Sequence, residues 1–277
     1  MILTFDIGNT ETVMGLFEAG DLVDHWRMTT QVERTVDELG LLVRSMIRES
    51  GYDVERIRAA GIASVVPPVT PNVVQMCDLH LGIEAAVIDA RSPLPIRLDV
   101  EEPLSVGADR IANTLAAAYL YRTDTIAVDL GTATTFDCIT GDGVFLGGVI
   151  APGVKTGGDM LVSRTAKLPR IDLKPPTGVI GRRTETSLRS GIFYSAIDSI
   201  DGIVERIRAD WGRHDTLVVM TGGLAPLIGP HCRTVDRVEP LLTLYGIELA
   251  FRHIEEQRTG ARITTLKRTR IRRRLRG

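Results

Sequence analysis

Two short stretches of the chain place a carboxylate beside glycine and hydroxyl side chains, directly after an apolar run. In residues 2–10, Asp6 is followed by Gly8, Asn9 and Thr10, and residues 129–135 repeat the pattern. Glycine lets backbone N–H groups approach an anion, small polar side chains add donors, and a carboxylate suits a cation bound to phosphate. The same residue types also form ordinary turns. Two such acidic turns at the ends of separate apolar runs nevertheless predict the two sides of one nucleotide site.

The composition is that of a globular protein large enough for two domains. The chain has 277 residues, 44% hydrophobic and 25% charged. We find no apolar stretch of membrane-spanning length and no secretion pattern at the N-terminus, so a cytoplasmic protein with no membrane partner is expected. The three cysteines form no C-x-x-C pair, which argues against a disulfide framework or a zinc site.

Positive charge is concentrated at the C-terminal end. Residues 258–277 hold nine of the 33 Lys and Arg residues and no acidic residue. Such a segment can contact nucleic acid, but a solvated, disordered tail is the expected reading. Nucleic acid is therefore not predicted as a partner.

The apolar pattern predicts the same series of elements twice. In the first half, Thr35 can cap a helix, and the predicted elements are a strand beginning at Ile2, strands over 12–17 and 22–28, a helix over 36–49, a strand over 59–66, a helix over 71–81 and a strand over 85–88. A proline-containing linker then leads to a helix over 107–121.

The second half restarts with three strands joined by hairpins. The predicted elements are strands over 125–129, 134–140 and 144–150, helices over 154–165 and 185–211, a strand over 217–221 and a helix from about 241. We therefore predict an α/β protein made by duplication, with domains at 1–121 and 122–257 and a tail at 258–277. The cleft between the halves is the expected ligand site.

Several motifs, in this order, give the chain a family resemblance. They are D-I-G-N-T at Asp6, W-R-M-T-T at Trp26, S-V-V-P-P at Ser64, G-A-D-R at Gly107, D-L-G-T-A-T-T-F at Asp129, G-G-V-I-A-P-G at Gly147, A-K-L-P-R at Ala166 and T-G-G-L-A at Thr221. With them, residues 2–249 resemble a type III pantothenate kinase of the actin-like ATPase superfamily. The resemblance implies two ribonuclease-H-like domains related by duplication, with mixed sheets flanked by helices.

It also implies an activity: ATP-dependent phosphorylation of pantothenate to 4'-phosphopantothenate, the first step of coenzyme A synthesis. The implied cofactors are Mg²⁺ with ATP and a monovalent cation, K⁺ or NH₄⁺, at Asp129. Thr132 is an implied ATP contact. The implied phosphate loop consists of Asp6, Ile7, Gly8, Asn9, Thr10, Glu11, Thr12 and Val13.

The implied pantothenate site is the G-A-D-R segment, with Gly107, Ala108, Asp109 and Arg110, and Thr184 contributed across a homodimer interface. Asp109 is the implied proton acceptor, and a carboxylate in reach of a primary hydroxyl can orient it and take its proton. A carboxylate in the first turn of a helix also stabilises the helix without any catalytic role. Arg110 has the geometry to bind the carboxylate of pantothenate.

Two positions depart from many family members, and two other functions remain open. Val100 stands where a tyrosine is usual, and Arg183 where an asparagine is usual, so the contacts to the substrate are expected to differ. The alternatives are a kinase of the same superfamily with another small acceptor, and a non-catalytic transcription accessory factor.

Overall fold

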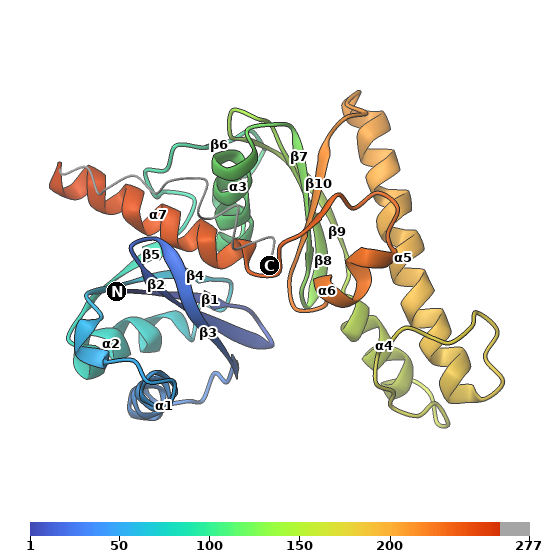
Figure 1. Ribbon diagram of the computed structural model, residues 1–277, viewed down its shortest axis with the longest axis horizontal. Helices are drawn as coiled ribbons and strands as arrows, with labels where there is room; N and C mark the ends of the chain where they lie inside the picture. Colours follow the sequence, from blue (N-terminus) through green and yellow to red (C-terminus); the bar gives the residue numbers. More distant parts are fainter. Residues whose placement is uncertain (261–277) are drawn as a thin grey trace. The chain divides into compact units, whose positions relative to one another are not determined.

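The structure is a computed structural model that describes residues 1–260, and the chain forms two compact units (Figure 1). The first unit comprises Met1–Leu120 together with the described residues from Leu242 onward, and the second comprises Tyr121–Leu241. The first contains β1 (Ile2–Ile7), β2 (Glu11–Glu18), β3 (Asp21–Thr29), α1 (Val36–Glu49), β4 (Ala59–Ser64), α2 (Thr70–Leu81), β5 (Glu84–Ile88), β6 (Arg97–Leu98), α3 (Ala108–Tyr121) and α7 (Leu242–Thr259). The second contains β7 (Thr125–Leu130), β8 (Ala133–Ile139), β9 (Val144–Pro152), α4 (Val154–Ser163), α5 (Thr184–Trp211), β10 (Leu217–Thr221), α6 (Ala225–Ile228) and β11 (Arg237–Val238).

In the first unit the strands lie in the order β3-β2-β1-β4-β5. The pairs among β1, β2 and β3 are antiparallel, and β1–β4 and β4–β5 are parallel. Leu3, Phe5 and Ile7 of β1 are fully or almost fully buried in a core shared with α1 and α2 on one face of the sheet (Figure 1). Alternation along the strand therefore turns Thr4 and Asp6 toward the other face.

Helix α1 begins where the sequence predicts it. The Glu38 N–H donates to Thr35 Oγ1 (3.3 Å), and the Thr35 N–H donates to Glu38 Oε2 (2.8 Å). This reciprocal capping box satisfies two backbone N–H groups that the first turn leaves without partners. The predicted cap and helix bounds are confirmed.

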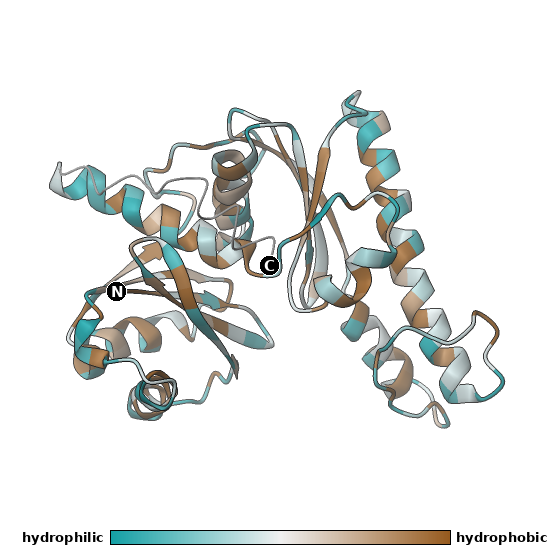
Figure 2. Cartoon of the chain, viewed as in Figure 1, coloured by the Kyte–Doolittle hydropathy of each residue, from teal (hydrophilic) through white to brown (hydrophobic). Residues whose placement is uncertain are grey.

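The second unit repeats the arrangement of the first. Its strands follow the order β9-β8-β7-β10-β11, with antiparallel pairs among the first three and parallel pairs after them. Ile126, Val128 and Met220 pack against α5 on one face of this sheet. Bands of apolar and polar residues alternate along α5, as expected for a helix with one buried side (Figure 2). The predicted duplication and α/β fold class are confirmed.

Helix α7 differs from the predicted domain plan, which assigned residues 242–257 to the C-terminal domain. The helix packs on the first sheet instead: Leu244 approaches Gly15 and Ile247 approaches Gly61, where the absence of a side chain leaves room. Arg258, predicted to begin the tail, lies in α7 and forms an ion pair with Glu84 (2.6 Å). Residues 261–277, which make up the rest of the predicted tail, lie outside the described residues.

Among residues 1–260, the helices are all too short or too polar to cross a bilayer. The short elements β6, α6 and β11 were not predicted. They contain two to four residues each, too few for a hydrophobic period to show.

Candidate active site

The first acidic turn is the tight hairpin connection between β1 and β2. Asp6 is half-buried near the end of β1, and the Gly8 N–H donates to the Glu11 carbonyl (3.0 Å). Asn9 and Thr10 are exposed at the tip. The predicted phosphate loop therefore presents small polar residues to solvent on a rigid turn.

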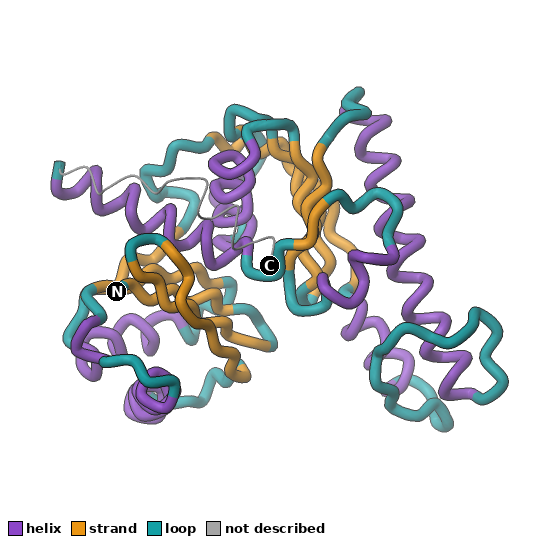
Figure 3. The backbone as a smooth tube through the Cα atoms, in the orientation of Figure 1, coloured by secondary structure: helices purple, strands orange, loops and turns teal. Residues whose placement is uncertain are grey.

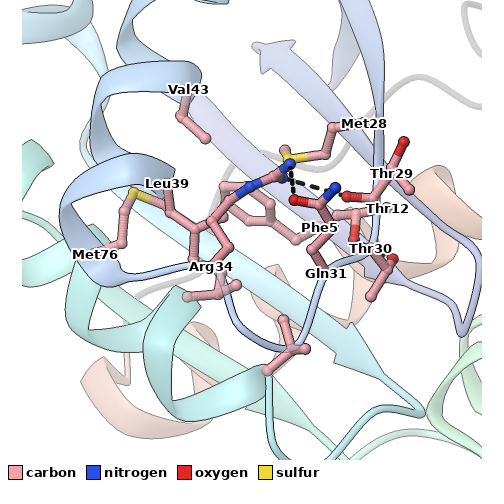
Figure 4. A pocket seen from close by; sticks show the side chains of 12 residues that line it. Phe5, Thr12, Met28, Thr29, Thr30, Gln31, Arg34, Leu39, Val43 and Met76 are labelled. Carbon is pink, nitrogen blue, oxygen red and sulfur yellow. Dashed lines mark hydrogen bonds between the residues drawn. The ribbon is translucent and has the colours of Figure 1, made fainter.

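Thr12 lies behind this turn and is almost fully buried. Its hydroxyl is hydrogen-bonded to the Thr30 hydroxyl (2.8 Å), and the Thr30 N–H donates to the Thr10 carbonyl (3.0 Å). Thr12 also lines a small cavity of about 10 Å³, in which Arg34 donates to Gln31 Oε1 (Figure 4). That volume holds about one water molecule. Thr12 thus stabilises the base of the loop through its hydrogen bond to Thr30.

The first turn and the G-A-D-R segment meet at one edge of the first sheet. Val65, directly after β4, donates its N–H to the Ile7 carbonyl (3.0 Å). A Cβ on Gly107 would lie 3.4 Å from Val65 Cγ1 and only 2.6 Å from Asp109 Oδ1. A side chain at 107 would therefore displace the Asp109 carboxylate from its present position.

Asp109 lies in the first turn of α3, half-buried. Its Oδ1 accepts a hydrogen bond from the Arg110 N–H (2.8 Å). Burial raises the pKa of Asp109 above its ordinary value of 3.8, although the Arg110 N–H and guanidinium act in the opposite direction. A raised pKa makes this carboxylate a stronger base than an exposed aspartate.

In the second unit, Asp129 is the next-to-last residue of β7 and lies beside a glycine that cannot be replaced without strain. Gly222 follows β10 with φ +92°, and a Cβ there would lie 2.7 Å from Asp129 Oδ1 and 2.8 Å from the Leu130 carbonyl oxygen. L-residues with side chains rarely adopt this φ, and the space is already filled by oxygen atoms. The T-G-G motif therefore shapes the surroundings of Asp129.

The second acidic turn packs against the start of α4. The Thr156 hydroxyl donates to the Thr132 carbonyl (2.7 Å), and a Cβ on Gly153 would lie 2.2 Å from the same carbonyl oxygen. Glycine at the N-cap thus lets α4 begin next to exposed Thr132. Backbone N–H groups at a helix N-terminus favour an anion.

The other predicted contacts lie elsewhere in the two units. Thr184 is the exposed first residue of α5, preceded by exposed Arg183, and Val100 is half-buried in the linker. A larger cavity of about 260 Å³ is lined by linker residues and Ile111, and none of the predicted site residues lines it.

The structure adds residues to which the sequence analysis gave no role. Val65, Gly153 and Gly222 hold the acidic side chains or turns in place through close approach. The signal was present in the S-V-V-P-P, G-G-V-I-A-P-G and T-G-G-L-A motifs, but close approach becomes visible only once the chain is folded. Within residues 1–260 there is no cluster of three or more His, Cys, Asp or Glu side chains suited to a metal. A cation here would need hydroxyl or carbonyl ligands as well.

Sequence comparison identifies the family. The sequence model of the family described as "Type III pantothenate kinase" matches residues 2–206. A type III pantothenate kinase of Moorella thermoacetica is 43% identical over 253 residues, which cover 91% of this chain and 98% of that protein. The chain belongs to the type III pantothenate kinase family. The resemblance inferred from the ordered motifs is confirmed.

Comparison of structures supports the fold alone. A Baf family transcriptional activator of Campylobacter jejuni matches with a TM-score of 0.56 at 16% identity, covering 94% of this chain and all of that one. The ethanolamine utilization protein EutJ of Carboxydothermus hydrogenoformans matches with a TM-score of 0.50 at 16% identity, covering 89% of this chain and 88% of that one. The kinase therefore shares with these proteins the fold seen here, a mixed α/β fold with two mixed sheets flanked by helices.

The raised pKa of Asp109 predicts a pH-dependent stability cost. Between pH 3.8 and the raised value, the folded protein holds a proton that the unfolded chain releases, so stability falls as pH rises through this window. Asp109→Asn does not titrate. We expect the melting temperature of Asp109→Asn, relative to that of the wild type, to increase as pH is raised from about 4 to 8. Calorimetry measures both melting temperatures. A gain that shrinks with rising pH would contradict the assigned shift.

Proposed function

We propose that this enzyme transfers the γ-phosphate of ATP to the primary hydroxyl of pantothenate, forming 4'-phosphopantothenate for coenzyme A synthesis. Family membership supports the reaction. The observation that carries the proposed roles is the meeting of two motifs at one sheet edge, through Ile7, Val65 and Gly107. This contact holds the acid of G-A-D-R beside the predicted phosphate loop.

Asp109 is the proposed proton acceptor. A primary hydroxyl is a weak nucleophile, and a carboxylate within hydrogen-bond reach orients it and accepts its proton as the bond to phosphorus forms. The hydrogen bond from the Arg110 N–H fixes the carboxyl group, and burial strengthens it as a base. Gly107, Ala108 and Arg110 complete this side of the substrate site, with the Arg110 guanidinium facing the pantothenate carboxylate.

Each acidic turn is proposed to bind phosphate oxygens of ATP. Residues Asp6 to Val13 supply the first loop, and Thr132 with the N-terminus of α4 supplies the second. Phosphoryl transfer depends mainly on alignment and on neutralising phosphate charge. Bound Mg²⁺ supplies that neutralisation, and Asp6 is the residue proposed to position the metal-bound nucleotide.

A monovalent cation, K⁺ or NH₄⁺, is proposed at Asp129. Gly222 leaves room for oxygen atoms of Asp129 and Leu130 beside the end of β10. Oxygen donors of this kind suit a hard cation. The cation would offset carboxylate charge next to the second acidic turn.

We also propose a cytoplasmic homodimer in which Thr184 reaches the partner's substrate site. The long loop that precedes α5 (Figure 3) is tied to the helix by the Ser190 hydroxyl, which donates to the Val179 carbonyl (2.6 Å). Val179 and Ile180 nevertheless expose 68% and 88% of their surfaces. Exposed apolar side chains close to the helix end that carries Thr184 fit an interface.

The role of Asp109 can be tested with Asp109→Asn. Without the proton acceptor, we expect kcat for pantothenate phosphorylation to fall by roughly 10²-fold or more, with little change in the KM for ATP. A coupled assay measures both constants. Asp37→Asn is a matched control because Asp37 is also a first-turn carboxylate, in α1. Turnover of Asp109→Asn within a few-fold of wild type would reject Asp109 as the proton acceptor. A separate screen of the wild type with acetate and sugars would reveal another phosphate acceptor.

Cation dependence can be tested by exchanging salts at constant ionic strength. We expect activity to be several-fold higher in potassium or ammonium chloride than in sodium chloride, because the larger ions suit a site of mixed oxygen ligands. Asp129→Asn should remove most of this difference. Equal wild-type activity in all three salts, with Mg²⁺ in excess, would count against the site.

The dimer can be tested by placing charge in the exposed loop. We expect Ile180→Asp to weaken self-association by about 10²-fold, since a buried interface anchor contributes roughly 2 kcal/mol or more. Sedimentation measures the association, and the KM for pantothenate should rise as dimer is lost. Leu41→Asp is the control, because Leu41 is an exposed apolar residue of α1. A wild-type protein that sediments as a monomer would refute the dimer.

A further inference from the structure

Three polar side chains form a row across one face of the second sheet. Asp129 of β7 is paired in register with Thr135 of β8 and with Thr221 of β10. Neighbouring residues of these strands, among them Val128, Phe136 and Met220, pack against α5 on the opposite face. Since side chains alternate along a strand, a carboxylate flanked by two threonines occupies the face away from α5.

The Thr221 hydroxyl is unusual in its burial. Thr221 is 0% exposed, and within residues 1–260 its Oγ1 has no hydrogen-bond partner. Buried hydroxyls elsewhere in this sheet are paired: Thr125, also fully buried, donates to the Thr123 carbonyl (2.8 Å). An unpaired buried polar group destabilises the fold, and a bound ion or water molecule would supply the missing partner.

The space next to Thr221 is bordered by further oxygen atoms. Gly222 has a positive φ, and the position of its missing side chain is 2.7 Å from Asp129 Oδ1 and 2.8 Å from the Leu130 carbonyl oxygen. Asp137, fully buried, lies on the same face two residues along from Thr135. A carboxylate oxygen of Asp129 and the carbonyl oxygen of Leu130 therefore lie beside the residue that directly follows Thr221.

We infer that Thr221 is a direct ligand of the monovalent cation proposed at Asp129, with Thr135 flanking the site. The inference rests on the proposed function, since it concerns the same cation. A large monovalent cation is held by several oxygen ligands, including neutral carbonyl and hydroxyl groups. A cation at this position gives the Thr221 hydroxyl a partner and neutralises the half-buried carboxylate of Asp129.

Thr221→Val tests this inference without relying on activity. Valine keeps the branched shape and removes the hydroxyl, so the protein in N-methylglucamine chloride should melt at or above the wild-type temperature. The potassium concentration for half-maximal stabilisation should rise at least about tenfold, because a ligand is lost. Thr221→Ser should restore the wild-type response. The titrations are followed by thermal unfolding of the full chain.

Thr125→Val is the matched control. It removes a paired hydroxyl from β7, so its melting temperature should fall in every salt while the potassium response remains that of wild type. A Thr221→Val protein that keeps the wild-type potassium response would overturn the inference. Should Thr221→Val not fold, Thr221→Ala serves with the same expected loss of response.

The design separates this inference from the wider function. A wild-type protein stabilised equally by potassium, sodium and N-methylglucamine would overturn both the Asp129 cation site and the Thr221 ligand. Pantothenate phosphorylation by the same preparation would still support the kinase activity. If potassium stabilises the wild type and Thr221→Val equally, the cation site at Asp129 is supported and only the role of Thr221 as a ligand is rejected.

Discussion

Parallel strand pairing is the constraint on which both halves of the candidate site depend. Because β1 and β4 run in the same direction, their carboxyl ends share one edge, and Val65 can bond to Ile7 directly beyond the last paired residues. In the second unit, β7 and β10 pair in the same way and place Thr221 next to Asp129. In each unit, parallel pairing therefore brings an acidic turn next to residues that are distant in the sequence, Val65 in the first unit and Thr221 in the second.

Glycine makes these contacts close enough to be useful. At 107, 153 and 222, a Cβ would lie within 2.7 Å of Asp109 Oδ1, the Thr132 carbonyl oxygen and Asp129 Oδ1, respectively. These glycines touch the carboxylates and carbonyls around which the proposed chemistry is arranged. The glycine-rich motifs of this family therefore describe close approach as much as turn flexibility.

The electrostatics of the two units differ in a way that suits phosphoryl transfer. In the first, burial strengthens Asp109 as a base, and a neighbouring backbone N–H holds it in place. In the second, the proposed cation and phosphate sites draw on a carboxylate, a helix N-terminus and a buried hydroxyl that has no hydrogen-bond partner within residues 1–260. Val100 and Arg183 belong to the substrate side that the motifs predict, so a difference from other family members is expected in pantothenate binding.

The sequence by itself determined the duplicated strand and helix pattern, the capped start of α1, the acidic turns and the family, because each is encoded in local periodicity or in residues adjacent along the chain. Only the tertiary structure decided that α7 packs on the first sheet, that Gly107 and Gly222 border the acidic residues, and that the Thr221 hydroxyl is buried with no hydrogen-bond partner in the described part of the chain. Those facts depend on which surfaces meet after folding. Hydrophobic patterning shows that a face will be buried, but the partner that buries it is chosen by long-range packing.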